Sequence, residues 1–421
     1  MKRLITCASL AAIGAASVYA QAVDGGSGRP WSVSAKLRGF YDDNWATAPE
    51  SGGPPKQSSW GINFAPGVSY VLVREQTTLT AKYDFDMRWY EARVENNTDY
   101  THRGELTLNH AFSERLRVDA TDTIVYSSEP GVIEPTWSLT NPFRSNNNAW
   151  RNYGAAGVTM GLTEKLGSRL GYSNTSYDYS ETGTASQSAL LDRMEHLISA
   201  DLRWQFQPTL TGLAGYQYGY WGYTSSDYIY QTSPGSPPSP TADARNQESH
   251  YGFLGADYTA AQGLTAQIRA GANYARYPNT EADDILAPFV DAALSYEYSK
   301  GSRVAVGVKH DLRPTDVAVV SQSNGTVTTS QEATTVYGFV SHRITPKLLG
   351  TLRGAWQGGT YQGGQYDDYT DNFYTVDVNL AYDLTTWLTA EAGYAYDKLD
   401  SDIPVRAYDR NRVYFGVKAT Y

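Results

Sequence analysis

The chain of 421 residues carries 34 basic and 44 acidic residues, which give it a formal net charge of -10. Because nucleic-acid binding leaves a basic footprint on a protein, this balance argues against nucleic acid as a partner. The mean hydropathy of -0.47 excludes a helical inner-membrane protein, since no run after the N-terminus approaches the roughly 18 apolar residues of a membrane helix.

The start of the chain has the pattern of a secretory signal peptide: two basic residues, a short alanine-rich apolar run, and small residues where signal peptidase would cut. We expect cleavage after Ala20 or Ala22, so that residues 1–22 are the signal peptide and residues 23–421 form one exported domain. Cys7 is the one cysteine and lies within the signal. The exported chain is therefore expected to fold without disulfides.

Alternation of apolar and polar residues predicts long strands along the chain. Residues 78–90 read TLTAKYDFDMRWY, with apolar side chains on one parity and mostly charged or polar side chains on the other. The same period of two runs through residues 193–206 and 374–384, and less cleanly through 116–126 and 209–223. A period of two over this length predicts a strand whose two faces meet different environments.

The connections between these strands alternate between two lengths. Short connections are expected at residues 73–77, 113–116, 163–166, 207–210, 260–264, 299–302, 345–348 and 384–387, and long ones include 42–59, 127–148, 224–247 and 397–408. An up-and-down antiparallel sheet with tight turns at one end and extended loops at the other has this alternation. Outer-membrane barrels show it, with short periplasmic turns and long extracellular loops.

The predicted fold class is all-β: a transmembrane up-and-down antiparallel β-barrel of about 18 strands in the bacterial outer membrane. Lipid offers no hydrogen-bond partners, so a sheet crosses the bilayer only when it has no unpaired edge. Residues 412–421 alternate up to the final carboxylate and are therefore expected to pair with residues 31–41.

The last strand also resembles the recognition signal that the barrel assembly machinery reads. Apolar residues occupy every second position and an aromatic residue ends the chain; these residues are Val413, Phe415, Val417, Ala419 and Tyr421. We expect this machinery, outer-membrane lipid and lipopolysaccharide to be partners of the protein.

Charged residues of both signs occupy the parity that would face the inside of the barrel. The predicted pore-lining residues are Lys82, Asp84, Asp86, Arg88, Arg117, Asp119, Asp201, Arg203, Arg269, Lys309, Asp377, Arg412 and Lys418. A barrel of about 18 strands leaves an aqueous lumen unless a loop folds into it. These charges would either pair across strands as solvated wall residues or set a transverse field that selects solutes.

Acidic residues collect in the long loops, as at Asp397, Asp400 and Asp402. Their oxygens suit calcium, alone or as a bridge to lipopolysaccharide, but their spacing matches no calcium-loop motif. We therefore expect no metal and no cofactor, and interpret the loop carboxylates as solvated charge. An acidic mouth would favour cations at low salt, over a Debye length of about 8 Å at physiological ionic strength.

An outer-membrane hydrolase is the enzyme hypothesis, and the spacing of the histidines disfavours it. No histidine is followed by serine two positions later, the arrangement that would place base and nucleophile on one strand face. His196, His250 and His310 lie near the loop side but share the lipid-facing parity. No catalytic residues are predicted, and we expect the protein not to be an enzyme.

The stretch GFYDDNW, residues 39–45, resembles the Tyr-Asp-x-Asn signature of the putative beta-barrel porin 2 family of Gram-negative bacteria. Tyr41, Asp42 and Asn44 are the matching positions, with Asp43 between them. The resemblance implies an outer-membrane barrel, and some members of the family are similar to barrels associated with exopolysaccharide export.

These observations predict a porin-like outer-membrane channel, either for passive passage of small polar solutes or for export of a polysaccharide. The alternative is a structural or adhesive barrel with a plugged lumen that acts through its extracellular loops. The two classes differ in whether the barrel conducts ions.

Overall fold

The computed structural model describes residues 29–129, 142–144, 148–230, 239–260, 263–321 and 325–421. The predicted signal peptide, residues 1–22, lies outside the described residues. Across the described ranges, no helix is both long and apolar enough to cross a membrane.

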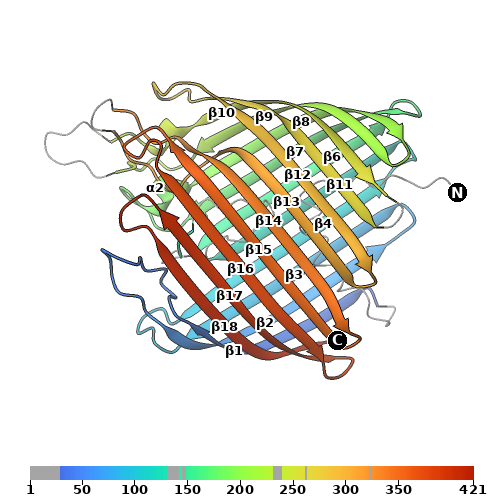
Figure 1. Ribbon diagram of the computed structural model, residues 1–421, viewed down its shortest axis with the longest axis horizontal. Helices are drawn as coiled ribbons and strands as arrows, with labels where there is room; N and C mark the ends of the chain where they lie inside the picture. The colour runs from blue at the N-terminus through green and yellow to red at the C-terminus, as the bar shows by residue number, and fades with distance from the viewer. Residues whose placement is uncertain (1–28, 130–141, 145–147, 231–238, 261–262, 322–324) are drawn as a thin grey trace.

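The described residues form a single antiparallel sheet of 18 strands. The strands are β1 (Trp31–Asp42), β2 (Ser59–Val73), β3 (Thr77–Tyr90), β4 (Thr98–Ala111), β5 (Leu116–Ser127), β6 (Ala149–Gly161), β7 (Leu166–Tyr179), β8 (Arg193–Gln207), β9 (Leu210–Tyr223), β10 (Gln247–Thr259), β11 (Leu264–Arg276), β12 (Ile285–Ser299), β13 (Ser302–Arg313), β14 (Ser330–Thr345), β15 (Leu348–Gln362), β16 (Thr370–Asp383), β17 (Leu388–Ser401) and β18 (Tyr408–Thr420). Each strand pairs with its neighbours in the chain, and β1 also pairs with β18. Figure 1 shows the resulting barrel of tilted strands. The predicted fold class is confirmed.

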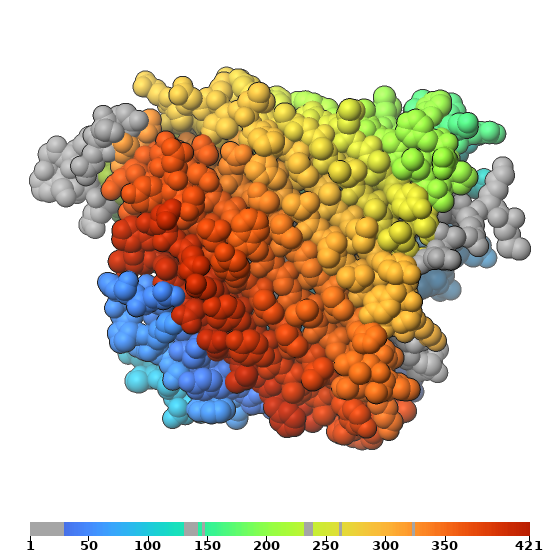
Figure 2. All heavy atoms as spheres, in the orientation of Figure 1, coloured from blue at the N-terminus to red at the C-terminus, as the bar shows by residue number. Residues whose placement is uncertain are grey.

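The barrel closes at the seam between the first and last strands. The register runs from Ser34 opposite Thr420 to Asp42 opposite Arg412. In Figure 2 the N-terminal (blue) and C-terminal (red) parts of the chain lie side by side along this seam. Because both edge strands are paired, the sheet presents no free edge to lipid. The predicted pairing of residues 412–421 with residues 31–41 is confirmed.

The connections have the two predicted lengths. The eight that lead from an even-numbered strand to the next strand are two to four residues long, and the other nine are six to 23 residues long. Figure 1 shows the two kinds at opposite ends of the barrel, with the C-terminus at the short-turn end. Two of the long loops carry short helices, α2 (Gln187–Leu191) and η1 (Ala242–Arg245).

Four of the short turns share one local structure. A hydroxyl side chain, that of Ser113, Thr163, Thr345 or Thr385, accepts hydrogen bonds from the backbone N–H groups two and three residues later, at 2.9 to 3.3 Å. Serine and threonine favour turns because their hydroxyls can satisfy backbone groups in this way. The second of the two bonded residues is the first residue of the following strand.

The outer face of the barrel is apolar, with aromatic side chains near both ends. Large apolar side chains such as Leu202, Leu254 and Phe415 are exposed on it. Rings pack together near the loop end, as in the pair Tyr41–Trp60 with centroids 4.9 Å apart. An apolar band flanked by aromatic residues is the surface that an outer-membrane barrel presents to lipid.

Candidate functional site: the charged lumen

A cavity of about 2370 Å³ lies inside the barrel, against β1 to β3 and β12 to β18. It extends from the short turns, where Lys300 and Lys347 contribute to its wall, to Asp42 and Tyr90 near the long loops. Pockets for one small ligand are usually about 300–1,000 Å³. The size is that of a lumen inside the barrel, larger than a pocket for a single small ligand.

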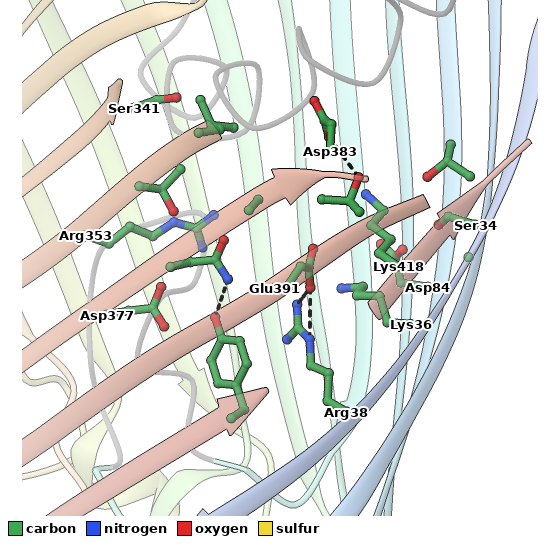
Figure 3. Close-up of a pocket in the computed structure, with 18 of the residues that line it drawn as sticks. Ser34, Lys36, Arg38, Asp84, Ser341, Arg353, Asp377, Asp383, Glu391 and Lys418 are labelled. Atoms are coloured by element: carbon green, nitrogen blue, oxygen red, sulfur yellow. Dashed lines mark hydrogen bonds and ion pairs between the residues drawn. The ribbon is translucent and has the colours of Figure 1, made fainter. Parts of the chain in front are cut away.

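The structure divides the 13 predicted inward-facing residues into two groups. Six of them lie on the wall of this cavity: Lys82, Asp84, Arg88, Asp377, Arg412 and Lys418. The other seven lie on the inward parity of their strands but not on the wall of this cavity: Asp86, Arg117, Asp119, Asp201, Arg203, Arg269 and Lys309. Figure 3 shows Asp84, Asp377 and Lys418 among the side chains of the wall.

Charged residues away from the cavity pair with one another across strands. Arg169 donates two hydrogen bonds to Asp119, at 2.6 and 2.7 Å. Arg203 of β8 lies 3.4 Å from Asp257 of β10 and 2.5 Å from Asp201 of its own strand. Pairing of this kind, both across strands and along one strand, is expected of a polar barrel wall.

Fourteen of the 20 charged residues on the cavity wall were not among the predicted pore-lining residues. Among these fourteen are Lys36 and Arg38 on β1, Arg353 on β15 and Glu391 on β17, which are labelled in Figure 3. The alternation within residues 31–41 carries the signal for the first two, since even-numbered positions of β1 face inward.

Arg38 and Glu391 are joined across the seam. Arg38 Nε donates to Glu391 Oε2 at 3.0 Å, and a second nitrogen of the same guanidinium also contacts that oxygen. Gly416 of β18 lies between them in the register, opposite each of the two residues. Because glycine has no side chain, the guanidinium and the carboxylate meet over the strand that separates them.

At the extracellular end, the inward-facing side chains are packed and buried. Five large ones are at most 1% exposed: Arg193, Tyr251, Tyr361, Tyr408 and Arg410. The loops take part in this packing, since Arg245 of η1 donates to the carbonyl of Leu190 in α2 at 2.9 Å. Within the described residues, the extracellular end of the lumen is filled by side chains and loops.

Loops from distant parts of the chain also meet through Arg406. Its guanidinium donates two hydrogen bonds of 2.7 Å to Asp316 and one of 2.9 Å to Asp371. Asp316 belongs to the β13–β14 loop, whereas Arg406 belongs to the β17–β18 loop. This bridge holds two extracellular loops together above the lumen.

Arg410 forms the buried end of the cavity. Its guanidinium lies 2.6 Å from Asp42 Oδ2 and 3.1 Å from Glu129 Oε2. Burial alone would raise the pKa of Glu129, but the neighbouring guanidinium groups of Arg410 and Arg88 hold this pKa below its ordinary value. The Glu129 carboxylate is therefore charged and paired at neutral pH.

The Tyr-Asp-x-Asn stretch joins the end of β1 to β18. Besides the bond of Asp42 to Arg410, Asp43 Oδ1 accepts the backbone N–H of Asn411 at 2.6 Å. The Asn44 amide donates to the carbonyl of Asp409 at 2.9 Å. Tyr41 is the exception, because its ring packs against Trp60 on the outer face. The polar residues of the stretch fasten the extracellular end of the seam.

The histidines considered for a hydrolase lie on the outer face. His196 and His250 each share a hydrogen bond with a tyrosine hydroxyl, of Tyr172 at 2.9 Å and of Tyr216 at 2.7 Å. His310 contacts Thr334 at 2.7 Å and Glu332 at 3.0 Å, which ties β13 to β14. Across the part of the chain that the structure describes, no group of three or more His, Cys, Asp or Glu side chains is placed to hold a metal ion.

A closed 18-strand barrel with an apolar outside and a charged inside is a porin-like outer-membrane β-barrel, and such a barrel lies in the bacterial outer membrane. The model of the family described as putative beta-barrel porin 2 matches residues 236–421. The match spans β10 to β18 and the segment just before them, and it bears out the resemblance over this part of the chain. Residues 39–45, which carry the quoted signature, lie outside the matched segment.

Solved outer-membrane proteins are similar to this chain in structure at low sequence identity. OccAB4 of Acinetobacter baumannii has 10% identity and a TM-score of 0.44, covering 94% of this chain and 100% of its own. A BenF-like porin of Pseudomonas fluorescens Pf-5 has 12% identity and a TM-score of 0.44, covering 93% and 99%. The outer membrane protein opdK of Pseudomonas aeruginosa has 11% identity and a TM-score of 0.42, covering 93% and 99%. A comparison with curated proteins found no match.

Proposed function

We propose that this protein is a channel through which small polar solutes cross the outer membrane passively. One observation carries the proposal: a cavity of about 2370 Å³ with a charged wall runs inside the closed barrel. Ions and polar solutes need such a wall, because its charges and hydroxyls replace the water that they lose. The six predicted residues on the cavity wall are its pore-lining residues, and the seven beside it stabilise the wall by pairing.

The packed extracellular end makes this channel a gated one. In the described residues, loops and inward side chains pack together at the end of the lumen, and the bridge from Arg406 to Asp316 is one of these contacts. Passage therefore requires these loops to move, and loop motions on the scale of microseconds or slower would open the channel in bursts. The same packing favours the second candidate, a plugged barrel that acts through its loops.

Ion conductance separates the two candidates. The purified protein would be inserted into a planar lipid bilayer at high salt, with heat-modifiable gel migration as the check that it is folded. Repeated conductance steps are expected if the barrel is a channel. A folded protein that leaves the bilayer silent over long recordings would contradict the proposal and favour the plugged barrel.

Polysaccharide export is the other transport hypothesis, and it would use the same lumen. A liposome-swelling assay with neutral sugars of increasing length tests it. Entry of small sugars alone is expected for a general channel for polar solutes. Entry of long oligosaccharides at a comparable rate would support polysaccharide export instead.

The outer surface carries the proposed contacts with the cell envelope. Its apolar band would contact acyl chains, and the loop-end rim would contact lipopolysaccharide. Val413, Phe415 and Tyr421 of the proposed assembly signal are exposed on this surface, where the assembly machinery can reach them.

A further inference from the structure

The cavity wall has a charge opposite in sign to that of the whole chain. Twelve basic and eight acidic side chains line the cavity, so its wall carries a formal net charge of +4. The chain as a whole carries -10. The acidic excess therefore lies elsewhere, and a solute inside the lumen meets an excess of cationic groups.

The excess is concentrated at a pair of lysines on the seam. Lys36 of β1 lies directly opposite Lys418 of β18, and both line the cavity. Like charges opposite each other in a sheet repel and destabilise the pairing. The other neighbouring strands place no acidic residue opposite the two lysines. Lys36 faces Ala65 of β2, and Lys418 faces Thr389 of β17.

The nearest carboxylates are already paired with other cations. Glu391 binds Arg38, as described above, and Asp84 forms an ion pair with Lys82. Among the described residues, no carboxylate lies within ion-pair distance of the Lys36 or Lys418 ammonium group. Figure 3 shows both lysine side chains extending into the cavity beside Asp84.

One hydroxyl group on the cavity wall lies beside this pair. Ser34 is two positions before Lys36 on the same face of β1, whereas Thr389, opposite Lys418, donates its hydroxyl to Asp383 at 2.9 Å. A carboxylate or phosphate has several acceptor oxygens, which ammonium groups and hydroxyls satisfy together. Two ammonium groups without carboxylate partners, with the Ser34 hydroxyl beside them, form a donor set that suits such an anion.

We propose that Lys36 and Lys418 form an anion-binding site in the lumen, and that the channel prefers small anionic solutes with carboxylate or phosphate groups. This inference rests on the proposed channel function. Selectivity arises because the lysine pair attracts anions and repels cations where the low-dielectric barrel wall strengthens the interaction. The acidic loops act at the exposed mouth, where salt screens them more strongly.

The test is the ion preference of the double variant K36Q/K418Q. In a potassium chloride gradient across a planar bilayer, the reversal potential of the wild type should have the sign of anion preference. The ratio of chloride to potassium permeability should fall by about threefold or more in the double variant, because two unpaired positive charges leave the lumen. K36R/K418R should keep the wild-type ratio.

Lys398→Gln is the matched control. It removes one positive charge from a partly exposed side chain of β17 that is paired with Asp400 at 2.8 Å and is not on the cavity wall. This variant should leave the permeability ratio unchanged. A conducting wild type that prefers cations would overturn the anion-binding site and leave the channel function intact. A double variant with the wild-type ratio of chloride to potassium permeability would do the same.

A binding measurement keeps the two proposals separate if the bilayer is silent. Inorganic phosphate should raise the thermal unfolding midpoint of folded wild-type protein in detergent, and it should raise that of K36Q/K418Q less. Silence in the bilayer together with this difference would refute the channel and retain the anion site. Equal effects of phosphate on the two proteins would refute the site.

Discussion

Arg410 connects three separate parts of the chain at a single buried position. Its partners Asp42 and Glu129 precede it by 368 and 281 residues, so the contact forms only when the barrel has closed. A buried ion pair is weak evidence of net stabilisation, but removing one partner leaves the others charged and unpaired in a dry environment. The contact therefore makes barrel closure sensitive to single changes.

Arg410→Gln should destabilise the barrel by about 3–5 kcal/mol, because Asp42 would stay buried without this cation and Glu129 would keep only the more distant Arg88. Urea unfolding in detergent micelles, followed by tryptophan fluorescence, measures the free energy of unfolding. Arg276→Gln is the control, since Arg276 is exposed at the loop end of β11. Equal losses in the two variants would mean that the network contributes no more than a surface charge.

Glu129 should make stability depend on pH in the acid range. Its pKa is lower in the folded protein than the ordinary value of about 4.5, so the folded state favours the ionised form. The resulting stabilisation is fully present above pH 4.5 and is lost as the pH falls toward the folded pKa. The urea midpoint of the wild type should fall below pH 4.5 more steeply than that of Glu129→Gln. Parallel curves for the two proteins would contradict this assignment.

At this scale, the sequence predicts which residues face inward but not which of them remain unpaired. The parity within residues 78–90 places Lys82 and Asp84 on one face, and they do lie together on the cavity wall. The opposition of Lys36 and Lys418 depends on the register between two strands that are distant in sequence. A shift of one residue would turn every side chain of a strand to the other face, and no local pattern fixes that register.

The strands and turns are the elements that the sequence predicts best. Alternation and short connections are local properties, and hydroxyl-bearing turns such as that at Thr163 follow from four consecutive residues. The strand at residues 209–223 has a blurred pattern because its glycines leave both faces without a clear difference, yet β9 pairs fully with β8 and β10. Pairing with its neighbours, not its own alternation, defines that strand.

Tyr421→Ser should reduce assembly of the barrel in the outer membrane. The ring of Tyr421 is exposed and lies against Trp31, with centroids 5.8 Å apart, so the backbone seam itself does not need it. The amount of folded, heat-modifiable protein in the outer-membrane fraction should fall severalfold. Tyr382→Ser, another exposed tyrosine near a short turn, should have little effect. Equal losses in both variants would point to membrane anchoring in place of an assembly signal.

At the scale of the whole molecule, described residues of distant long loops pack against one another at the extracellular end of the barrel. This packing could not be predicted from the sequence, because it depends on contacts between loops that are far apart in the chain. Arg406 and Asp316, for example, are separated by 90 residues. The composition of the loops indicates only polar, turn-rich segments, which would suit extended and packed loops equally well.

Arg406→Gln should raise the fraction of time for which the channel is open. The variant loses the bridge between the β13–β14 and β17–β18 loops, and a loss of about 1.4 kcal/mol of packing would change the ratio of open to closed states about tenfold. Single-channel recording in planar bilayers measures this ratio, with Arg276→Gln as the control. An unchanged ratio in Arg406→Gln would show that these loops do not form the gate.

Because the seam is closed, the first and last strands are neighbours like any other pair of strands in the barrel. The backbone N–H of Val33 donates to the carbonyl of Tyr421 at 2.9 Å, and the N–H of Tyr421 returns a bond of 2.8 Å to the carbonyl of Val33. A short linker could therefore join these neighbouring positions, and the chain could be cut at another hairpin on the same rim. Such a circularly permuted polypeptide would keep every strand pair of the cylinder, and its new N- and C-termini would lie on a different pair of neighbouring strands.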